Sequence, residues 1–548
     1  MVKKIFLGSL FLGLVACGGG SSSGGNDAET PAPKPGVPAP KANTLPVASA
    51  VSITDANGSS LWTGDELLGQ YTYTDAEGDV EGATTLRWLI DGIEVATGSR
   101  YTASKEEAGK SLVFEVTPLA IAGLLTGQAS SSSSALIMKR NLQFFTANTL
   151  ERSIDLFATD GTEAGTISLG LTTSTVISEP VKLGEKWFFA VYNSDVSKRF
   201  LAETDGTAEG TKIFTEGPEV MGSLNLTEFN GELYFTGNGG EGNQLWVVDD
   251  TITAGATLFR EIENGGSPRN FTVAGDQMFF TAYQTSTGDE LWVTNGDSSH
   301  EGTHLVKNIT AGDVSSSFSS FHNFKNKLYL VQSNVIWVSD GTDSGTQRLS
   351  EIPGSYKANN FVTMGEYFFF IDSSSGTPAS VWGSDGVTLT RLHDSPAENK
   401  HYINSLTVSN GKVHFVSSKE LYEATMAGAQ KVDLSTSNVT ISSITDLTNL
   451  NNKLLFSATP PDVRNSELYQ YNGSKVSLVK DITGDSEASY PKQLTVLNDR
   501  VLFKADDGIS GSELWETDGT EVGTVLLKDI KSGALGSNIY LDIELGQH

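Results

Sequence analysis

The chain has 548 residues, of which 38% are hydrophobic and 19% charged, and 66 acidic residues outnumber 37 basic ones to give a formal net charge of −29. This length predicts two or three folded domains, and the hydrophobic content is sufficient for packed cores. The acidic balance argues against nucleic acid as a partner, because phosphates need a basic surface.

Residues 1–17 have the pattern of an export signal. Lys3 and Lys4 precede an apolar run over residues 5–16, which is too short to cross a membrane as a permanent helix. The run ends in Leu-Val-Ala before Cys17. This ending resembles the lipobox of bacterial lipoproteins, and the resemblance implies cleavage before Cys17 and acylation of its thiol. The alternative is an ordinary signal peptide that is cut elsewhere.

Residues 18–46 predict a disordered tether behind that cysteine. They are rich in Gly and Ser and then in Pro, Ala and Lys, so they cannot bury enough apolar surface to fold. By the same lipoprotein resemblance, Gly18 after the cysteine implies the outer membrane as destination, and the leaflet, facing the periplasm or the cell surface, stays open. Because Cys17 is the only cysteine, the folded part is expected to have no disulfide and no thiolate metal site.

Residues 47–138 predict a small β-sandwich. Short alternating runs are separated by turn residues, Asp91-Gly92 favours a hairpin, and Trp88 lies mid-strand as a candidate core residue. With Gly69-Gln-Tyr71, Arg87-Trp88 and an acidic loop, the segment resembles the immunoglobulin-like domains of bacterial surface proteins. That resemblance implies two packed antiparallel sheets without the disulfide of antibody domains.

The acidic loop is a candidate calcium site. Asp75, Glu77, Asp79 and Glu81 alternate around a glycine, and Ca²⁺ takes six to eight oxygen ligands. The spacing does not complete an EF-hand loop, and the simpler, favoured interpretation is a solvated loop between strands.

Residues 139–548 contain a tandem repeat. Its clearest copy is Glu-Leu-Trp-Glu-Thr-Asp-Gly-Thr-Glu-Val-Gly-Thr over residues 513–524. The aromatic position of the repeat, which one alanine also occupies, falls at Phe157, Ala202, Trp246, Trp292, Trp337, Trp382, Tyr422, Tyr469 and Trp515. The successive differences are 45, 44, 46, 45, 45, 40, 47 and 46 residues, a regularity that indicates repeated structural units.

Each unit contains four short β signals, which is typical of a propeller blade. The units resemble the bacterial repeat family named for its Glu-Leu-Trp-x-x-Asp-Gly-Thr (ELWxxDGT) motif. Units seven and eight lack Asp-Gly-Thr, and unit three has Asp-Asp-Thr over residues 249–251. The predicted fold class is therefore all-β, an immunoglobulin-like sandwich followed by a propeller of about nine four-stranded blades, with eight as the alternative.

The repeat motif is expected to serve the scaffold. Its aspartates, Asp160, Asp205, Asp340 and Asp518, can accept backbone hydrogen bonds within a turn, where the following glycine takes positive φ. Its tryptophans, among them Trp292, Trp337 and Trp515, are expected to pack between neighbouring sheets. The alternative is a rim of carboxylates that binds cations or a sugar.

Two segments compete to complete the first unit. An extra strand signal over residues 538–545 can pair with that unit and join the ends of a ring. Residues 135–139 can instead supply its innermost strand, unless the preceding domain uses them.

The sequence contains no pattern that assigns catalysis. It has neither an HExxH, a Gly-x-Ser-x-Gly nor a phosphate-binding Gly-Lys-Ser/Thr motif, so no catalytic residue and no required cofactor is predicted. We expect a binding or scaffolding lipoprotein, anchored to the outer membrane, with a protein or glycan partner. The alternatives are a carbohydrate-active enzyme with its site at the propeller mouth, and a periplasmic envelope-assembly factor.

Overall fold

The computed structural model divides the chain into two compact units, residues 1–139 and 140–548, close to the boundary expected after residue 138. It describes residues 43–55, 61, 63–122, 125–137, 141–150, 154–171, 174–221, 226–249, 256–352, 358–373, 378–396, 403–434, 441, 443–460, 465–484 and 488–541. Cys17, the export signal and most of the tether lie outside these residues. Over the described ranges the chain is almost entirely β, and none of its helices is long and apolar enough to cross a membrane.

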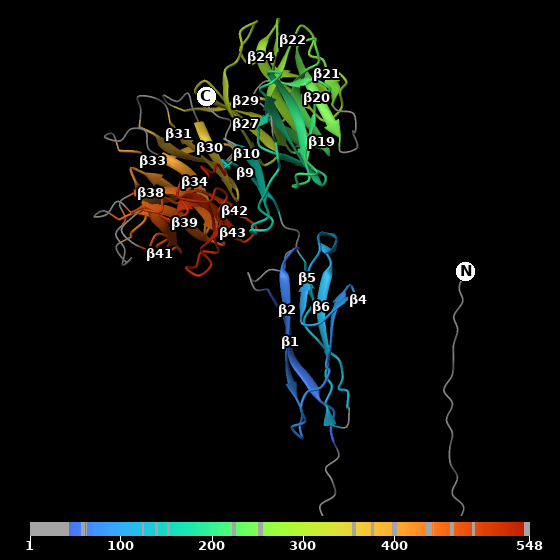
Figure 1. The fold of residues 1–548 in the computed structure, drawn as a ribbon. Coiled ribbons are helices and arrows are strands. Elements are labelled where there is room, and N and C mark those ends of the chain that lie inside the picture. The colour runs from blue at the N-terminus through green and yellow to red at the C-terminus, as the bar shows by residue number, and fades with distance from the viewer. Residues whose placement is uncertain are drawn as a thin grey trace, which may run out of the picture. The chain divides into compact units, whose positions relative to one another are not determined.

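The first unit consists of two antiparallel sheets (Figure 1). One sheet contains β1 (Val47–Asp55), β2 (Glu66–Thr74) and β5 (Arg100–Thr102). The other contains β3 (Thr85–Ile90), β4 (Ile93–Thr97), β6 (Ser111–Thr117), β7 (Ser130–Ser131) and β8 (Ala135–Leu136). A three-residue 3-10 helix, Lys105–Glu107, follows β5.

The core of this unit lies between the two sheets. Alternate residues of β6 are buried, as the period of two in a half-buried strand requires. Trp88 and Phe114 are fully buried and pack with Leu67 of the other sheet. The indole Nε1–H of Trp88 donates to the carbonyl oxygen of Gly98 at 2.9 Å, so this polar group is satisfied inside the core.

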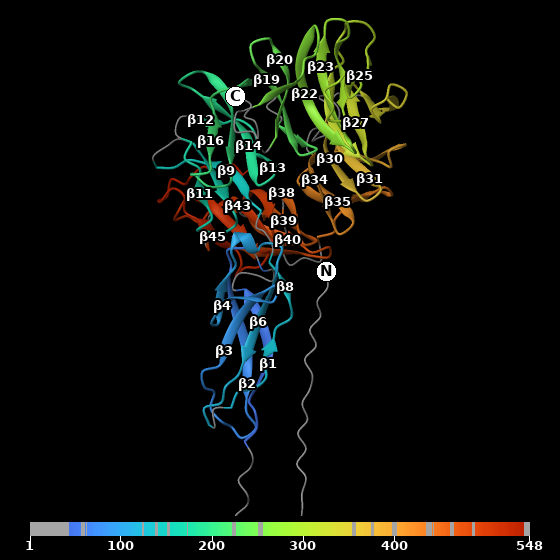
Figure 2. The same ribbon diagram turned by 90° about the vertical axis from the view of Figure 1, so that its right-hand side faces the viewer.

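The second unit is a series of antiparallel sheets that follow one another along the chain (Figure 2). The first three are β9 (Gln143–Ala147), β10 (Asp155–Thr159), β11 (Ile167–Ser168); β12 (Ser174–Val176), β13 (Val181–Leu183), β14 (Lys186–Asn193), β15 (Lys198–Thr204), β16 (Lys212–Phe214); and β17 (Glu219–Val220), β18 (Thr227–Phe229), β19 (Glu232–Asn238), β20 (Asn243–Asp249), β21 (Thr257–Arg260). In the second and third sheets, two short strands pair with the same neighbour.

The remaining sheets each contain four strands in sequence order. They are β22 (Gly265–Ala274), β23 (Gln277–Gln284), β24 (Gly288–Thr294), β25 (Thr303–Lys307); β26 (Phe318–Phe324), β27 (Lys327–Gln332), β28 (Val335–Ser339), β29 (Gln347–Glu351); β30 (Ala358–Met364), β31 (Tyr367–Asp372), β32 (Ser380–Ser384), β33 (Leu389–Asp394); β34 (Ile403–Ser409), β35 (Lys412–Ser417), β36 (Glu420–Thr425), β37 (Gly428–Lys431); β38 (Ser443–Leu450), β39 (Lys453–Thr459), β40 (Glu467–Tyr471), β41 (Val476–Lys480); and β42 (Lys492–Leu497), β43 (Arg500–Asp506), β44 (Ser512–Thr517), β45 (Val525–Lys528).

The loops of such sheets alternate between two edges. We call the edge with the turns between second and third strands, and with the connections from one sheet to the next, the upper face. The lower face carries the turns between first and second strands and the Asp-Gly-Thr loops between third and fourth strands.

Hydrophobic clusters join consecutive sheets. In the fourth sheet, Trp292 packs against the third sheet, whereas Leu291 packs against the fifth. Adjacent residues of a strand point to opposite faces, so a strand with two buried faces has a continuous apolar run. All five residues of β10 and of β32 are buried in this way.

The last sheet packs against the first through the carboxy-terminal segment. Ile539 and Leu541 are buried with Phe145 of β9 and Leu514 of β44. Tyr540 and Thr146 exchange two backbone hydrogen bonds, with N–O distances of 3.0 and 2.8 Å. Residues 135–136 are β8 and pair with β6 in the first unit. The segment beside the first sheet is therefore the carboxy-terminal one.

We call the first strand of each sheet its innermost strand. The carboxy-terminal segment has the backbone conformation of these strands. Those strands contain a register shift, and a residue with positive φ lies at the shift in β22, β30, β34, β38 and β42. These residues are Asn270, Asn360, Ser405, Asp446 and Gln493, with φ from 41° to 60°. Asn538, with φ 50°, takes the same position before Ile539. The side chain of Asp446 accepts the backbone N–H of Gln493 at 2.9 Å. The side chain of Gln493 in turn accepts the backbone N–H of Leu541 at 3.2 Å. Each of these residues thus bonds to the innermost segment of the next sheet.

We predict that Ile539→Ala lowers the free energy of unfolding by about 2–5 kcal/mol, because its fully buried side chain lies where the last sheet meets the first. Chemical denaturation followed by tryptophan fluorescence measures the change. Val522→Ala, at a side chain that is 89% exposed, is the control and should change stability by less than about 0.5 kcal/mol. Equal effects of the two substitutions would contradict the packing of the last sheet on the first.

Candidate functional site

The Asp-Gly-Thr loop is a compact hydrogen-bonded turn. In the last sheet, Asp518 Oδ1 accepts the backbone N–H of Thr520 at 2.8 Å and its hydroxyl at 2.6 Å. The Thr520 Oγ1 accepts the N–H of Gly523 at 3.0 Å, and its carbonyl accepts the Thr524 hydroxyl at 2.6 Å. Thr517 and Thr524 share a hydrogen bond between their buried hydroxyls. The motif residues therefore satisfy one another within the loop.

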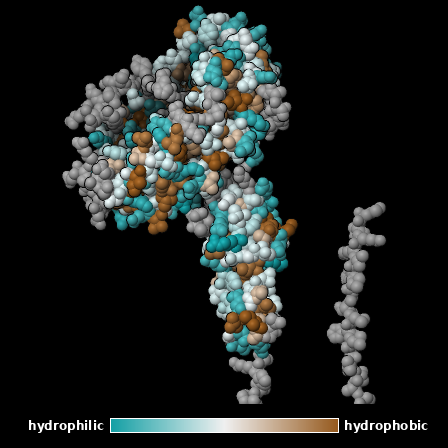
Figure 3. Space-filling view, in the orientation of Figure 1, coloured by the Kyte–Doolittle hydropathy of each residue, from teal (hydrophilic) through white to brown (hydrophobic). Residues whose placement is uncertain are grey.

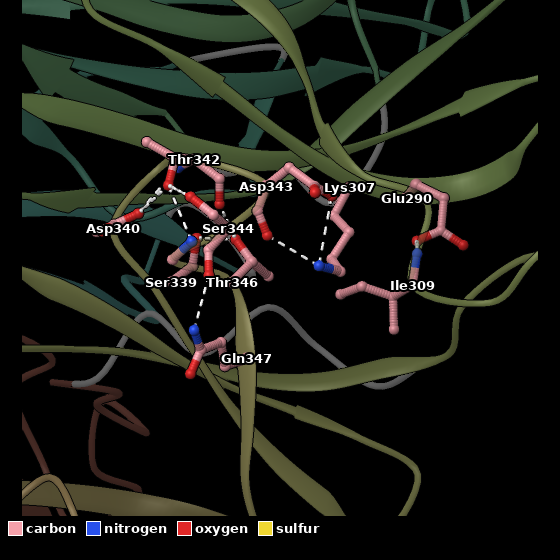
Figure 4. A network of polar contacts seen from close by, with 11 residues as sticks. Glu290, Lys307, Ile309, Ser339, Asp340, Thr342, Asp343, Ser344, Thr346 and Gln347 are labelled. Atoms are coloured by element: carbon pink, nitrogen blue, oxygen red, sulfur yellow. Dashed lines mark hydrogen bonds and ion pairs between the residues drawn. The ribbon is translucent and has the colours of Figure 1, made fainter.

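The same bonds recur in the loops of Asp160, Asp205 and Asp340. Figure 4 shows the loop of Asp340. The glycine five residues after each aspartate is required sterically, because a Cβ there would overlap the carboxylate. The hydrogen bond from the Thr342 hydroxyl lowers the pKa of Asp340 below its usual value.

Two loops that depart from the motif keep part of this geometry. In the eighth sheet, Asn472 Oδ1 accepts the hydroxyl of Ser474 at 2.9 Å and the N–H of Lys475 at 3.1 Å. In the sixth, Asp385 Oδ1 accepts the backbone N–H groups of Val387 and Thr388. The feature common to these turns is therefore a side-chain oxygen at the first position, which accepts hydrogen bonds from the residues that follow.

Lysines of the fourth strands connect each of three loops to the preceding sheet. Lys307 Nζ donates to the carbonyl oxygen of Asp343 at 2.8 Å and lies 3.3 Å from its carboxylate (Figure 4). Lys480 donates to the carbonyl of Thr524 at 2.8 Å. Lys528 of the last sheet donates to the carbonyl of Thr166 in the first sheet at 2.6 Å. The loops on the lower face therefore also hold neighbouring sheets together.

Tryptophans of the repeat stack on aromatic residues of the adjacent strand. Trp292 stacks on Phe280, its cross-strand partner, and Trp382 stacks likewise on Phe370. Among the described residues, no acceptor meets the indole N–H of Trp246, Trp292, Trp337, Trp382 or Trp515. These tryptophans contribute the apolar surface of their rings and form no hydrogen bond through the N–H group with the described part of the chain. Phe157 can therefore take the same position and stack on Phe145.

The glutamate of Glu-Leu-Trp has a structural role that the repeat pattern did not predict. Glu290 and Glu513 are fully buried. The Glu513 carboxylate accepts the N–H of Ile530 at 2.9 Å, the N–H of Lys531 at 3.4 Å and the Ser537 hydroxyl at 2.7 Å. Glu290 accepts the corresponding three groups of the connection to the fifth sheet. Each glutamate thus fixes the chain as it leaves its sheet.

The acidic loop of the first unit uses its carboxylates in separate contacts. Asp75 Oδ1 accepts the N–H groups of Glu77 and Asp79 at 3.0 and 3.1 Å. Glu81 accepts the hydroxyl of Tyr71 at 2.7 Å, and burial raises the pKa of that tyrosine to about 12. Within the described ranges, no group of three or more His, Cys, Asp or Glu side chains is arranged to hold a metal ion.

A pocket opens on the upper face between the third and fourth sheets, with a volume of about 590 Å³. Asn243 of β20 lines one side. Arg269 of β22, Tyr283 of β23 and Asp289 of β24 line the other. None of these residues belongs to the repeat motif, so its regular spacing could not have indicated them.

Comparisons with known proteins find similarity to solved structures only at low identity. No family model and no curated protein matches it. It is similar to a puromycin hydrolase mutant (12% identity, TM-score 0.35, 64% of this chain and 53% of the other), so it spans about half that chain's length. It is also similar to the β-propeller domain of the Trilobed protease from Pyrococcus furiosus (11%, TM-score 0.30, 66% and 99%) and to BamB from Moraxella catarrhalis (10%, TM-score 0.33, 56% and 88%).

We predict that the buried carboxylate of Glu513 makes stability depend on pH. Burial raises its pKa in the folded chain above the unfolded value, so the folded chain binds the proton more tightly. Its contribution is then fully present below the unfolded pKa of about 4.3 and is lost as pH rises through the folded pKa. The difference in unfolding free energy, wild type minus Glu513→Gln, should therefore fall as pH rises from 4 to 7. Glu521→Gln, at an exposed loop position, is the matched control, and a difference that rises with pH would contradict the sign.

Proposed function

We propose that the chain is an outer-membrane-anchored lipoprotein, with an immunoglobulin-like sandwich and a nine-bladed propeller, that binds envelope or surface material without catalysing a reaction. The lipobox-like ending at Cys17 supports the anchor. One sheet for each repeat, together with the packing of the last sheet on the first, supports nine blades. The sandwich would act as a spacer between the tether and the propeller.

The observation that carries the binding role is the uneven distribution of exposed apolar side chains between the two faces. In the described loops of the upper face, these side chains are Leu150, Ile154, Val196, Val314, Tyr490, Ile509 and Leu535. Those of the lower face are Val387 and Val522. On the side of the molecule seen in Figure 3, apolar residues form small patches among hydrophilic ones. Contiguous apolar patches rimmed by polar residues mark interaction surfaces, and we propose that these side chains contribute to one.

The lower face is less suited to a partner. Its Asp-Gly-Thr loops use their carboxylates and hydroxyls internally, and the lysines of preceding sheets occupy their carbonyl oxygens. A partner there would have to break these bonds or meet an acidic surface. The repeated network of the upper face uses buried glutamates, among them Glu290 and Glu513, and does not involve the exposed apolar side chains of its loops, so we assign binding to that face.

A carbohydrate-active enzyme is the second candidate, and it requires carboxylates that converge at a propeller mouth. The exposed residues of the innermost strands in the described part are mainly amides and hydroxyls, among them Asn359, Asn360, Asn404 and Ser405. Asp446 lies on such a strand, but its carboxylate accepts the N–H of Gln493. A periplasmic assembly factor would use the same face, and protease treatment of intact cells would separate it from a surface protein.

We predict that Ile509→Ser with Leu535→Ser weakens binding of the purified chain to isolated envelope fractions by at least about tenfold, because two exposed apolar contacts are lost. Ile509 and Leu535 are 79% and 87% exposed on the upper face. Val387→Ser with Val522→Ser, at side chains 73% and 89% exposed on the lower face, is the matched control. Equal losses from the two double variants, or no envelope binding by the wild type, would contradict the proposal.

We also predict that the anchor depends on Cys17. In bacteria grown with an alkyne analogue of palmitate, the wild-type chain should carry the label and sediment with membranes. Cys17→Ala removes the thiol and should abolish both, since stable anchorage needs acyl chains. Ser22→Ala is the control in the same segment, and label on the Cys17→Ala variant would refute lipidation at this residue.

A further inference from the structure

The pocket between the third and fourth sheets has a backbone that the other innermost strands lack. β22 contains two register shifts against β23, from Gly266 to Arg269 and from Arg269 to Thr272. In the described part of the unit, the other innermost strands contain at most one. A bulge bends a strand and redirects its side chains. The extra shift lies at the pocket, and Arg269, between the two shifts, pairs with Asp289.

The pocket brings together a planar cation, a carboxylate and an aromatic ring. Arg269 Nη2 lies 2.8 Å from Asp289 Oδ2, and Arg269 Nη1 donates to the carbonyl oxygen of Ser267 at 3.3 Å. Asp289 Oδ1 is buried, so the oxygen that faces a ligand beside Arg269 is Oδ2. Tyr283 is 40% exposed at the end of β23. The site thus combines the donors of Arg269, the carboxylate of Asp289 and an aromatic ring.

Glycines keep the walls of the pocket close together. Gly266 has φ +143°, a conformation that L side chains rarely adopt, and a Cβ there would overlap the carbonyl oxygen of Asn243. The backbones of the third and fourth sheets can approach only because this side chain is missing. Asn243 donates from Nδ2 to the Ser267 hydroxyl at 3.4 Å, which places its amide at the pocket edge.

We propose that this pocket binds a neutral saccharide. A sugar ring presents an apolar face of C–H groups that can stack on Tyr283, and its adjacent hydroxyls match the Arg269–Asp289 pair. One hydroxyl donates to Asp289, and its neighbour accepts from Arg269. The ion pair leaves no net positive charge for an acidic sugar. This inference rests on the proposed binding function and names the ligand class of one site on the upper face.

The test is binding of the full chain to immobilised neutral gluco-, galacto- and manno-oligosaccharides, with uronate oligosaccharides as the acidic comparison. We expect a neutral oligosaccharide to bind. Tyr283→Ala and Asp289→Asn should each weaken that binding about tenfold or more, whereas Tyr283→Phe, which keeps the ring, should retain it. Tyr367→Ala is the matched control, since Tyr367 is 37% exposed on the lower face. Thermal unfolding of every variant shows whether a loss comes from misfolding.

The outcomes separate the two proposals. Loss in Tyr283→Ala and Asp289→Asn, with normal unfolding and normal binding by Tyr367→Ala, supports the saccharide site. Preference for uronates, or neutral binding unchanged by Tyr283→Ala, overturns it. If the wild-type chain binds envelope fractions but no oligosaccharide, the saccharide inference fails and the binding function stands. If it binds neither, both fail.

Discussion

Every sheet of the second unit is apolar on both faces, and this constraint governs the rest of its structure. Leu291 and Trp292 are neighbours in one strand, yet they are buried against different sheets. A sheet of this kind cannot be stable at the end of a row, because one face would stay in water. The packing of Phe145 with Leu514 and Ile539 removes that difficulty by giving the first and last sheets each other as partners.

Polar side chains of the repeat also form their hydrogen bonds within their own sheet or with the adjacent one. Asp518 serves its own loop, Glu513 the connection that leaves its sheet, and Lys528 the loop of the adjacent sheet. The bonds of Asp518 lie within its loop, whereas the bonds of Glu513 and Lys528 depend on where the chain runs to the adjacent sheet. Apolar packing supplies the attraction between sheets, and these bonds fix their spacing and registration.

The sequence predicted the all-β composition and the many four-stranded antiparallel sheets, because strand alternation and a period near 45 residues are local patterns. It left open whether residues 135–139 or 538–545 complete the first sheet, since both are strand candidates and the preceding domain could use the former. It did not predict the roles of Glu513 and Lys528, whose partners lie in other segments. The pocket of Arg269 and Tyr283 also escaped prediction, because a second bulge in β22 is a backbone irregularity without a fixed sequence pattern.

The segment that pairs beside β9 comes from residues 538–541, some four hundred positions after β9 in order of synthesis. A nascent chain therefore carries an incomplete, apolar first sheet until residues 538–541 have been made. The amino-terminal sandwich has all its strands within the first 139 residues and can fold long before. Folding therefore has an early step, in which the first unit forms, and a late step, in which the first and last sheets of the second unit meet. A truncated chain without residues 538–541 cannot complete the late step. Its first sheet would keep an open edge, which would expose it to proteolysis.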